Sequence, residues 1–385
     1  MDFDLNEEQS MLKDSVDKLL SNRYDFDARK KHAKHAEGFS PEIWTQLAEL
    51  GVLAIPFAEE HGGLGGGAVE TMIVMESIGR SLVLEPYFAT VILGGGIVNT
   101  AGSDAQKGEI LPAVADGSLR LAFAHAERQS RYNIFDVKTT AKKSGDGWVI
   151  DGEKALVLHG DSAQKLIVSA RTAGGQRDED GLSLFIVDAG AKGVSRRGFP
   201  TQDMQRGAEI TLAGVQVGAD ALIGEAGKAG PVIAQVIDAA IAALCSEAVG
   251  AMEAMHKETI EYLKTRKQFG VAIGQFQVLQ HRGAEMFVAL EQARSMAYYA
   301  TMMASEKDAA ERHKAIAAAK VQIGRSGKFI GQNAVQLHGG VGMTMELKVG
   351  HYFKRMTMID LAFGDADHHL AYVAAQPGGL LPASL

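Results

Sequence analysis

Apolar residues recur at helical spacing over the first third of the chain. Trp44, Leu47, Leu50 and Leu53 follow one another every three residues, which places them on one face of an amphipathic helix. The opening stretch MDFDLNEEQSMLKDSVDKLL has the same texture with an excess of acidic residues. The pattern predicts an all-α domain over residues 1–120.

One glycine-dense stretch, EEHGGLGGG at residues 59–67, interrupts this helical pattern. It follows no predicted strand and lacks the lysine of a phosphate-binding loop, so its composition favours an ordinary loop.

The periodicity changes near residue 121. Short β-branched runs such as GWVIDGEKALVL and KLIVSART alternate with turn material such as SGDG at residues 144–147. No helical pattern intervenes, so we expect a mainly antiparallel β domain, a small barrel or sandwich, over residues 121–229. Hairpins are expected at SGDG and at the DG pair of residues 151–152.

Helical periodicity returns near residue 229. Four segments are expected as long helices that form an antiparallel four-helix bundle over residues 230–385: 230–267, 273–305, 309–338 and 345–375. The alanine-rich stretch RHKAIAAAKVQIG suits close helix packing and a subunit interface, and the tail QPGGLLPASL is expected to be loose.

Composition narrows the functional classes. A net charge of -8 and a pI near 5.9 argue against a general nucleic-acid binder. The single cysteine, Cys245, excludes an intrachain disulfide and fits a reducing compartment. The sequence shows no export leader and no uncharged apolar run of about 18 residues. These features predict a cytoplasmic protein.

The segment IAALCSEAVGAM, residues 241–252, carries one carboxylate, Glu247, in an otherwise apolar helix. A buried carboxylate requires hydrogen bonds, a partner charge or a proton. Glu247 either faces solvent, pairs with an arginine or lysine of a neighbouring helix, or has a chemical function.

Four segments resemble the acyl-CoA dehydrogenase family: FDLNEEQSMLKDSV, LAELGVLAIPFAEEHGGLG, YLKTRKQFGVAIGQFQVLQH and QLHGGVGM. The resemblance covers essentially the whole chain. It implies an FAD-dependent oxidoreductase of fatty-acid metabolism that acts on an acyl-CoA, passes electrons to an electron-transfer flavoprotein and assembles as a tetramer. AERQSRYNIFDVKTTA and ALVLHGDSAQKLIVSARTAGG look most like small subunits of pimeloyl-CoA dehydrogenase-type enzymes.

The resemblance also implies cofactor-binding residues. Those that would reach the FAD of a neighbouring subunit are Arg266, Phe269, Gln277, Gln336, Gly339 and Gly340. Phe123 and Leu158 would lie at the flavin ring of the chain's own site. Here the sequence departs from the family, because Ala126 replaces a threonine, and Leu156 and Leu158 replace a tryptophan and a threonine. Each lost hydroxyl removes a hydrogen bond worth about 0.5–1.5 kcal/mol.

The family's catalytic base is missing at its usual position. In the stretch DLAFGDADHHL, Phe363 stands where most members have a glutamate before a glycine, and Ala240 fills the position of a second family arrangement. Glu247 lies seven residues after Ala240, on the same helix face but about 10 Å along the axis. Glu247 is therefore the candidate catalytic residue, with a structural acid as the alternative.

The cluster Asp365, Asp367, His368 and His369 near Phe363 offers a metal site as a further alternative. Two adjacent histidines cannot both point inward, so solvation of a helix end is favoured and no metal is assigned. Two functions remain open: an active dehydrogenase that uses Glu247, or a non-catalytic partner subunit that contributes half of an FAD site to a heteromer.

Overall fold

The computed structural model describes residues 5–376, so the expected loose tail lies outside the described residues. Its contacts divide the chain into two compact units. The bundle unit comprises Met1–Arg29, Ala68–Val83 and Ile241–Leu385, and the sheet unit comprises Lys30–Gly67 and Leu84–Ala240. Helical, β and helical segments follow one another along the sequence as expected, whereas the boundaries at residues 120 and 229 remain predictions.

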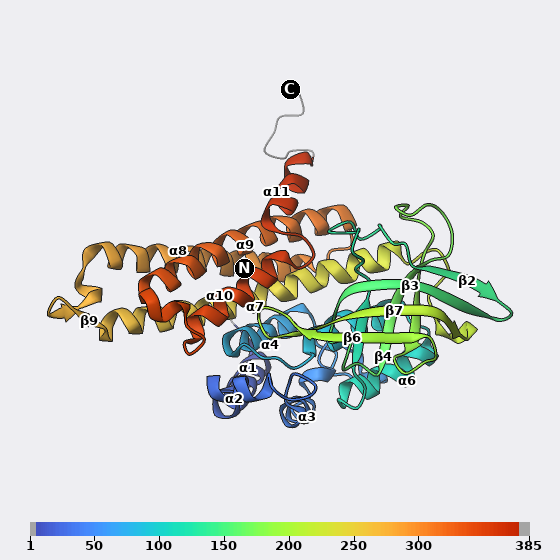
Figure 1. Ribbon diagram of the computed structural model, residues 1–385, viewed down its shortest axis with the longest axis horizontal. Helices are drawn as coiled ribbons and strands as arrows, with labels where there is room; N and C mark the ends of the chain where they lie inside the picture. The colour runs from blue at the N-terminus through green and yellow to red at the C-terminus, as the bar shows by residue number, and fades with distance from the viewer. Residues whose placement is uncertain (1–4, 377–385) are drawn as a thin grey trace. The chain divides into compact units, whose positions relative to one another are not determined.

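The bundle unit is built from long helices. Three of them, α7 (Gly230–Thr265), α8 (Gln277–Met303) and α9 (Ala309–His338), run alongside one another (Figure 1). Two shorter helices, α10 (Lys348–Leu361) and α11 (Ala366–Ala375), pack against α9. Sequence signals set the ends of several helices, since Asp308 caps the N-terminus of α9 and Asp365 caps that of α11.

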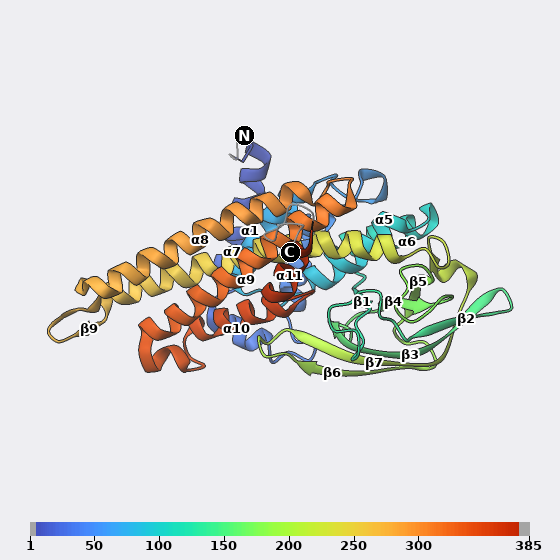
Figure 2. The ribbon, with the colours of Figure 1, turned by 90° about the horizontal axis from the view of Figure 1, so that it is seen from above.

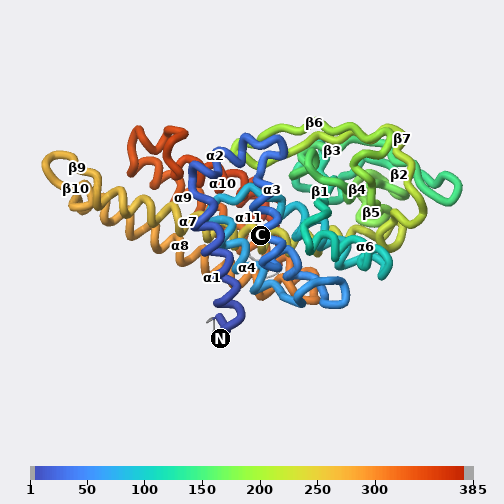
Figure 3. Tube along the Cα trace, turned by 90° about the horizontal axis from the view of Figure 1, so that it is seen from below, coloured from blue at the N-terminus to red at the C-terminus, as the bar shows by residue number. Residues whose placement is uncertain are grey.

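The first and fourth helical segments of the chain complete this unit. Helix α1 (Glu7–Arg23) begins at a capping box formed by Asn6 and Gln9, and it lies beside α4 (Ala68–Ser81) (Figure 3). Helix α2 (Phe26–His32) follows α1. Helices α4 and α7 cross closely because each contributes a glycine: a Cβ on Gly79 would meet the Glu247 carbonyl, and one on Gly250 would meet the Glu76 carbonyl.

Helix α7 is a core helix. By length and hydropathy it is the one helix in the described part of the chain that could span a membrane, yet 78% of its most apolar 18-residue window is buried within the protein. Its apolar composition is accounted for by packing, because the helix is buried on all sides from Ile241 to Met252.

The sheet unit holds one mixed, mainly antiparallel sheet (Figure 2). The strand order is β6-β7-β3-β2-β4-β5-β8, and β1 pairs with β4 in parallel. The strands are β1 (Leu121–Ala124), β2 (Thr140–Ser144), β3 (Gly147–Leu158), β4 (Lys165–Arg171), β5 (Leu182–Asp188), β6 (Val194–Pro200), β7 (Arg206–Val217) and β8 (Leu222–Ile223). Ile150, Val168, Phe185 and Ile210 lie in its core.

Helices also belong to the sheet unit. They are α3 (Pro41–Glu49), α5 (Gly96–Ala101), α6 (Asp104–Ala115), the short 3-10 turns Val52–Ala54 and Glu59–His61, and a π-helix at Phe88–Gly95. The glycine-dense stretch continues from the turn at Glu59–His61 without regular structure to Gly67, which confirms the expected loop.

Some sequence expectations about the elements were right and others wrong. The hairpin at SGDG is confirmed, because Ser144 pairs with Gly147. The DG pair forms no turn. Gly152 lies inside β3 at a register shift, where its missing Cβ leaves room for Thr139. Strand β6 was missed because the sequence VSRRGFP lacks an apolar alternation, as suits an edge strand.

The expected fourth bundle helix over residues 345–375 is wrong. It is two helices, α10 and α11, separated by a sharp turn. Phe363 and Gly364 both adopt positive φ values, 57° and 113°, which a helix cannot accommodate.

Candidate functional site

Glu247 makes a bidentate ion pair with Arg355 of α10. Arg355 Nε donates to Oε1 at 2.6 Å and Nη2 donates to Oε2 at 2.7 Å. The Glu247 side chain is 2% exposed and that of Arg355 is 12% exposed. Parallel donation from a guanidinium to a carboxylate is the strongest form of such a pair.

The surroundings of Glu247 therefore match the interpretation in which it meets an arginine of a neighbouring helix. Each carboxylate oxygen already accepts a charge-assisted hydrogen bond. A proton-abstraction role would require the side chain to leave Arg355 and expose that guanidinium. Its role as catalytic base stays a prediction.

Phe363 occupies the turn between α10 and α11 and is half-buried. Its carbonyl lies 3.1 Å from Nε2 of His369, which is itself 2% exposed. Burial lowers the pKa of His369 to about 3, so its ring is neutral and donates to this carbonyl.

The acidic and histidine residues that follow this turn lie at the N-terminus of α11. Asp365 accepts a hydrogen bond from the His368 amide at 2.8 Å as the N-cap, while Asp367 and His368 are exposed. Within residues 5–376, no group of three His, Cys, Asp or Glu side chains is arranged to hold a metal ion.

The RKQFG motif forms an exposed hairpin at one end of the bundle unit. Strands β9 (Lys267–Gln268) and β10 (Val271–Ala272) pair across it, and Phe269 at its tip is 91% exposed with φ 54°. Arg266 precedes the hairpin and Gln277 begins α8, and both are exposed. A large aromatic side chain held in solvent in a strained conformation is typical of a contact with another molecule.

The QLHGG motif lies at the same end of the bundle unit. The ring of His338 lies against that of Tyr262, four residues before Arg266, with centroids 4.4 Å apart and planes inclined at 31°. Beyond His338 the chain leaves α9 through Gly339 at φ 64°, and a Cβ on Gly339 or Gly340 would find no atom within 4 Å. Gln336 is exposed on the last turn. The structure thus brings both motifs together within one unit.

Phe123 and Leu158 lie on neighbouring parts of the sheet unit. The amide of Ala155, near the C-terminal end of strand β3, donates to the Ala126 carbonyl just after β1 at 2.9 Å. Phe123 is nearly buried and stacks parallel to His125 at 5.0 Å, while Leu158 is half-buried at the end of β3. These positions offer apolar surface, and Ala126 and Leu158 carry no side-chain donor.

The sequence analysis missed a buried polar cluster beneath these strands. Lys154 Nζ, fully buried, donates to Glu127 at 2.8 Å and to Ser169 Oγ at 3.1 Å. Ser169 Oγ lies 2.9 Å from His125 Nδ1. Burial, together with the charge of Lys154, lowers the pKa of His125 to about 3, so its ring is neutral.

Glu127 anchors the loop that follows β1. It accepts from the amides of Lys138 and Thr139 at 2.8 and 3.0 Å and from Gln129 at 2.8 Å. Burial alone would raise the pKa of Glu127, but Lys154 and these donors outweigh it and lower the pKa to about 2. The alternating pattern expected of a strand gives no sign of a lysine pointing inward, so sequence reasoning had no signal for this pair.

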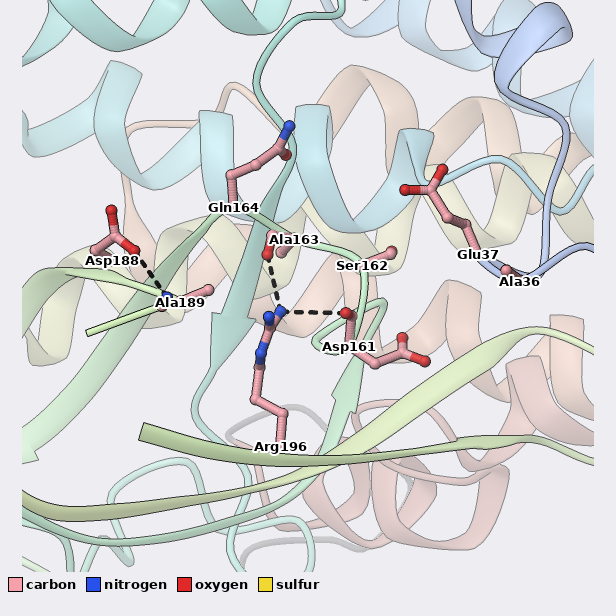
Figure 4. A pocket seen from close by; sticks show the side chains of 10 residues that line it. Ala36, Glu37, Asp161, Ser162, Ala163, Gln164, Asp188, Ala189 and Arg196 are labelled. Atoms are coloured by element: carbon pink, nitrogen blue, oxygen red, sulfur yellow. Dashed lines mark hydrogen bonds between the residues drawn. The ribbon is translucent and has the colours of Figure 1, made fainter. Parts of the chain in front are cut away.

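A polar hollow of about 480 Å³ lies elsewhere in the sheet unit (Figure 4). Arg196 extends across it and donates to the carbonyls of Gly160, Asp161 and Ala163. None of the predicted site residues lines this hollow, and the carbonyl contacts of Arg196 give it a structural role.

Protein-family models match three consecutive stretches of the chain. Residues 6–118, 122–213 and 231–377 match the N-terminal, middle and C-terminal domains of acyl-CoA dehydrogenase. The chain belongs to the acyl-CoA dehydrogenase family. This membership confirms the expected fold class and identifies the protein as an oxidoreductase of a flavoprotein family.

Individual relatives span nearly the whole chain. The acyl-CoA dehydrogenase FadE12 of Mycobacterium tuberculosis is 29% identical over 97% of this chain and 97% of its own length. The long-chain specific acyl-CoA dehydrogenase of Sus scrofa mitochondria is 30% identical over 82% of this chain and 74% of its own. A solved FAD-dependent dehydrogenase shares 26% identity with a TM-score of 0.89, covering 99% of this chain and 100% of that one.

FAD is the cofactor of this family, and the described residues fit it unequally. The exposed arginine, the aromatic side chain and the open glycine backbone of the bundle unit suit the phosphates and adenine of a dinucleotide. Phe123 and Leu158 suit the flat face of a flavin ring. The polar edge of that ring would find no side-chain donor at Ala126, Leu156 or Leu158.

Proposed function

We propose that this chain is a partner subunit in the FAD-dependent α,β-dehydrogenation of an acyl-CoA thioester, and that a second subunit supplies the catalytic base. The observation that carries this proposal is the bidentate pair between Arg355 and Glu247. It occupies Glu247, the candidate to replace the base missing at Phe363.

The reaction needs a base for the α proton and an acceptor for the β hydride. FAD accepts the hydride when it is bound. To remove the proton, the base needs a free lone pair within hydrogen-bond distance of the α C–H group. Phe363 and Ala240 have no proton acceptor, and Glu247 is held by Arg355.

The contribution of this chain is the exposed half-site of the bundle unit. In this proposal Arg266 and Gln277 bind phosphate oxygens and Phe269 covers an adenine. Gln336, Gly339 and Gly340 approach the nucleotide from the adjoining loop. These groups are exposed in the isolated chain, so they are available to bind a nucleotide that a neighbouring subunit holds.

Assembly is supported by apolar side chains on the same unit. Helix α8 exposes a set of large hydrophobic residues: Val278, Phe287, Val288, Tyr299 and Met302. Exposed apolar side chains concentrated on one helix are typical of subunit interfaces. We further propose that the chain assembles as a homo- or hetero-tetramer of acyl-CoA dehydrogenase subunits, passes electrons to an electron-transfer flavoprotein and is located in the cytoplasm.

The second candidate is an active dehydrogenase in which Glu247 itself abstracts the proton. It is favoured by the position of Glu247 on the face of Ala240, and it requires ligand binding to separate Glu247 from Arg355. The finer resemblance to small subunits of pimeloyl-CoA dehydrogenase-type enzymes agrees better with the partner role, since such a subunit acts beside a second one.

The visible spectrum of the purified chain separates the two candidates. A partner subunit is expected to be colourless alone and to gain flavin absorbance when mixed with a catalytic acyl-CoA dehydrogenase subunit. Stoichiometric flavin that is bleached by butyryl-CoA in the chain alone would instead establish the active enzyme. In that case Glu247→Gln should abolish exchange of the α proton with solvent deuterium while FAD stays bound, and unchanged exchange would remove Glu247 from the mechanism.

A further inference from the structure

One buried ammonium group is hydrogen-bonded to the backbone carbonyls around Phe363. Lys320 of α9 is fully buried, and its Nζ lies within hydrogen-bond distance of four carbonyl oxygens, so one of its three N–H groups is shared between two of them. These are Ile359 at 2.7 Å, Asp360 at 2.8 Å, Ala362 at 3.1 Å and Gly364 at 2.9 Å. The first two belong to the last turn of α10, where the Ile359 carbonyl also accepts from the amide of the C-cap residue Ala362 at 3.3 Å.

The turn that these carbonyls enclose is strained. Phe363 has φ 57°, a conformation that L-residues with a bulky side chain adopt rarely and at a cost of about 1–2 kcal/mol. Such conformations persist only where the surrounding structure imposes them, and they concentrate at functional positions. The strained residue is flanked on both sides by carbonyls that Lys320 holds.

Two more hydrogen bonds fix the same turn. His369 lies 3.1 Å from the Phe363 carbonyl, and Asp360 Oδ1 accepts from the Ala366 amide at 3.2 Å. Gly324, one turn beyond Lys320 on α9, lacks the Cβ that would collide with the Asp360 carboxylate. The turn is therefore hydrogen-bonded to residues of both α9 and α11, and Lys320 provides most of these hydrogen bonds.

We propose that Lys320 is a positioning residue, whose four carbonyl contacts hold Phe363 in the left-handed conformation and so determine which side chain the turn presents to the acyl-CoA ligand. The part that concerns the ligand rests on the proposed function. The part that concerns the turn does not. In this chain the turn presents a phenyl ring where a proton acceptor is expected, so its contribution is to the shape of the acyl site.

Lys320 is an ammonium near neutral pH. Burial lowers its pKa to about 8, and Cys245, Asp360 and Asp365 oppose that decrease. A charged donor surrounded by carbonyls forms stronger hydrogen bonds than a neutral amine would, which suits a positioning role.

The first experiment measures strain without any ligand. Phe363→Gly and Phe363→Ala both remove the ring, but only glycine adopts positive φ without penalty. With Lys320 present, the glycine variant should unfold roughly 1–2 °C above the alanine variant. With Lys320→Met this difference should disappear, because the turn is free to relax.

Two outcomes would overturn the positioning role. Equal melting temperatures of the glycine and alanine variants beside an intact Lys320 would show that the turn is not held. If the difference in melting temperature persists in the Lys320→Met background, residues other than Lys320 hold the turn. Lys328→Met, an exposed lysine on the same helix, is the matched control and should preserve the difference. If Lys320→Met does not fold, Lys320→Gln keeps two N–H donors and should reduce the difference partly.

The second experiment measures butyryl-CoA affinity by calorimetry in the assembled, flavin-loaded protein. Lys320→Met should weaken binding at least threefold when Phe363 is present and have no further effect in the Phe363→Ala background. Independent effects of the two substitutions would refute the link to the ligand. Absence of butyryl-CoA binding in the unmodified assembly would count against the proposed function and would leave the strain experiment to decide the role of Lys320.

Discussion

Arg355 and Glu247 join α10 to α7 through two parallel hydrogen bonds of 2.6 and 2.7 Å between guanidinium and carboxylate. The pair answers the question that the apolar segment around Glu247 raises, because the acid is compensated inside the protein. It also means that stability and any chemistry at Glu247 are coupled.

Breaking this pair should destabilise the protein strongly. Glu247→Ala removes two charge-assisted hydrogen bonds from a nearly buried guanidinium, and we expect a loss of about 3–5 kcal/mol in the free energy of unfolding. The double variant Glu247→Leu with Arg355→Leu should recover most of that loss, since no uncompensated charge remains. Urea denaturation of the single and double variants measures the coupling. A Glu247→Ala variant as stable as the parent protein would show that the pair is not formed in solution.

The buried pair of Lys154 and Glu127 should be equally sensitive. Glu127→Gln leaves a fully buried ammonium next to a neutral amide, and we expect the unfolding free energy to fall by about 3 kcal/mol or more. Amide exchange of residues 126–139 should accelerate, because Glu127 anchors this loop through the Lys138 and Thr139 amides. Glu261→Gln, in an exposed pair with Lys264, is the control and should leave both measurements unchanged.

Buried histidines should make the protein sensitive to mild acid. Burial lowers the pKa of His125 and His369 to about 3 and that of His159 to about 4. The unfolded chain takes up these protons near pH 6.5 and the folded chain does not, so stability falls as the pH decreases from about 6.5 towards the folded pKa values. Each histidine should remove about 2 kcal/mol between pH 7 and pH 5.

His159→Asn tests this titration, because asparagine tolerates the φ of 51° at this position. Denaturation midpoints at pH 7 and pH 5 should differ less in this variant than in the parent protein. His281→Asn, at an exposed histidine, should change nothing. Identical pH dependence of His159→Asn and the parent would contradict the prediction for His159.

Phe269 should be needed for subunit assembly and for FAD binding, but not for folding. Its side chain is 91% exposed, so Phe269→Ala should shift the melting temperature by less than about 1 °C. The flavin content of the assembled protein should fall at least tenfold. Thermal unfolding and the absorbance near 450 nm measure the two effects. Met11→Ala removes an exposed apolar side chain of α1 as a matched control, and full flavin content in Phe269→Ala would exclude the residue from the nucleotide site.

The sequence was sufficient for much of the fold. Period-3.6 and period-2 patterns depend on which face of an element is buried, and they separated helical from β segments along the chain. The hairpin at SGDG followed from turn chemistry alone. Gly364 and the N-cap Asp365 are local signals for a break in the helix, but the left-handed conformation of Phe363 did not follow from the sequence, because it is imposed by Lys320, 43 positions earlier, together with His369.

The candidate site divides in the same way. Sequence alone indicated the exposed RKQFG and QLHGG motifs, and it identified Glu247 as an acid that needs an explanation. Only the tertiary structure decided that Arg355, 108 residues away, is its partner, and that Lys154 faces Glu127 inside the sheet unit. Periodicity records the average environment of a face, whereas a buried charge is decided by one specific partner that comes from a distant part of the chain.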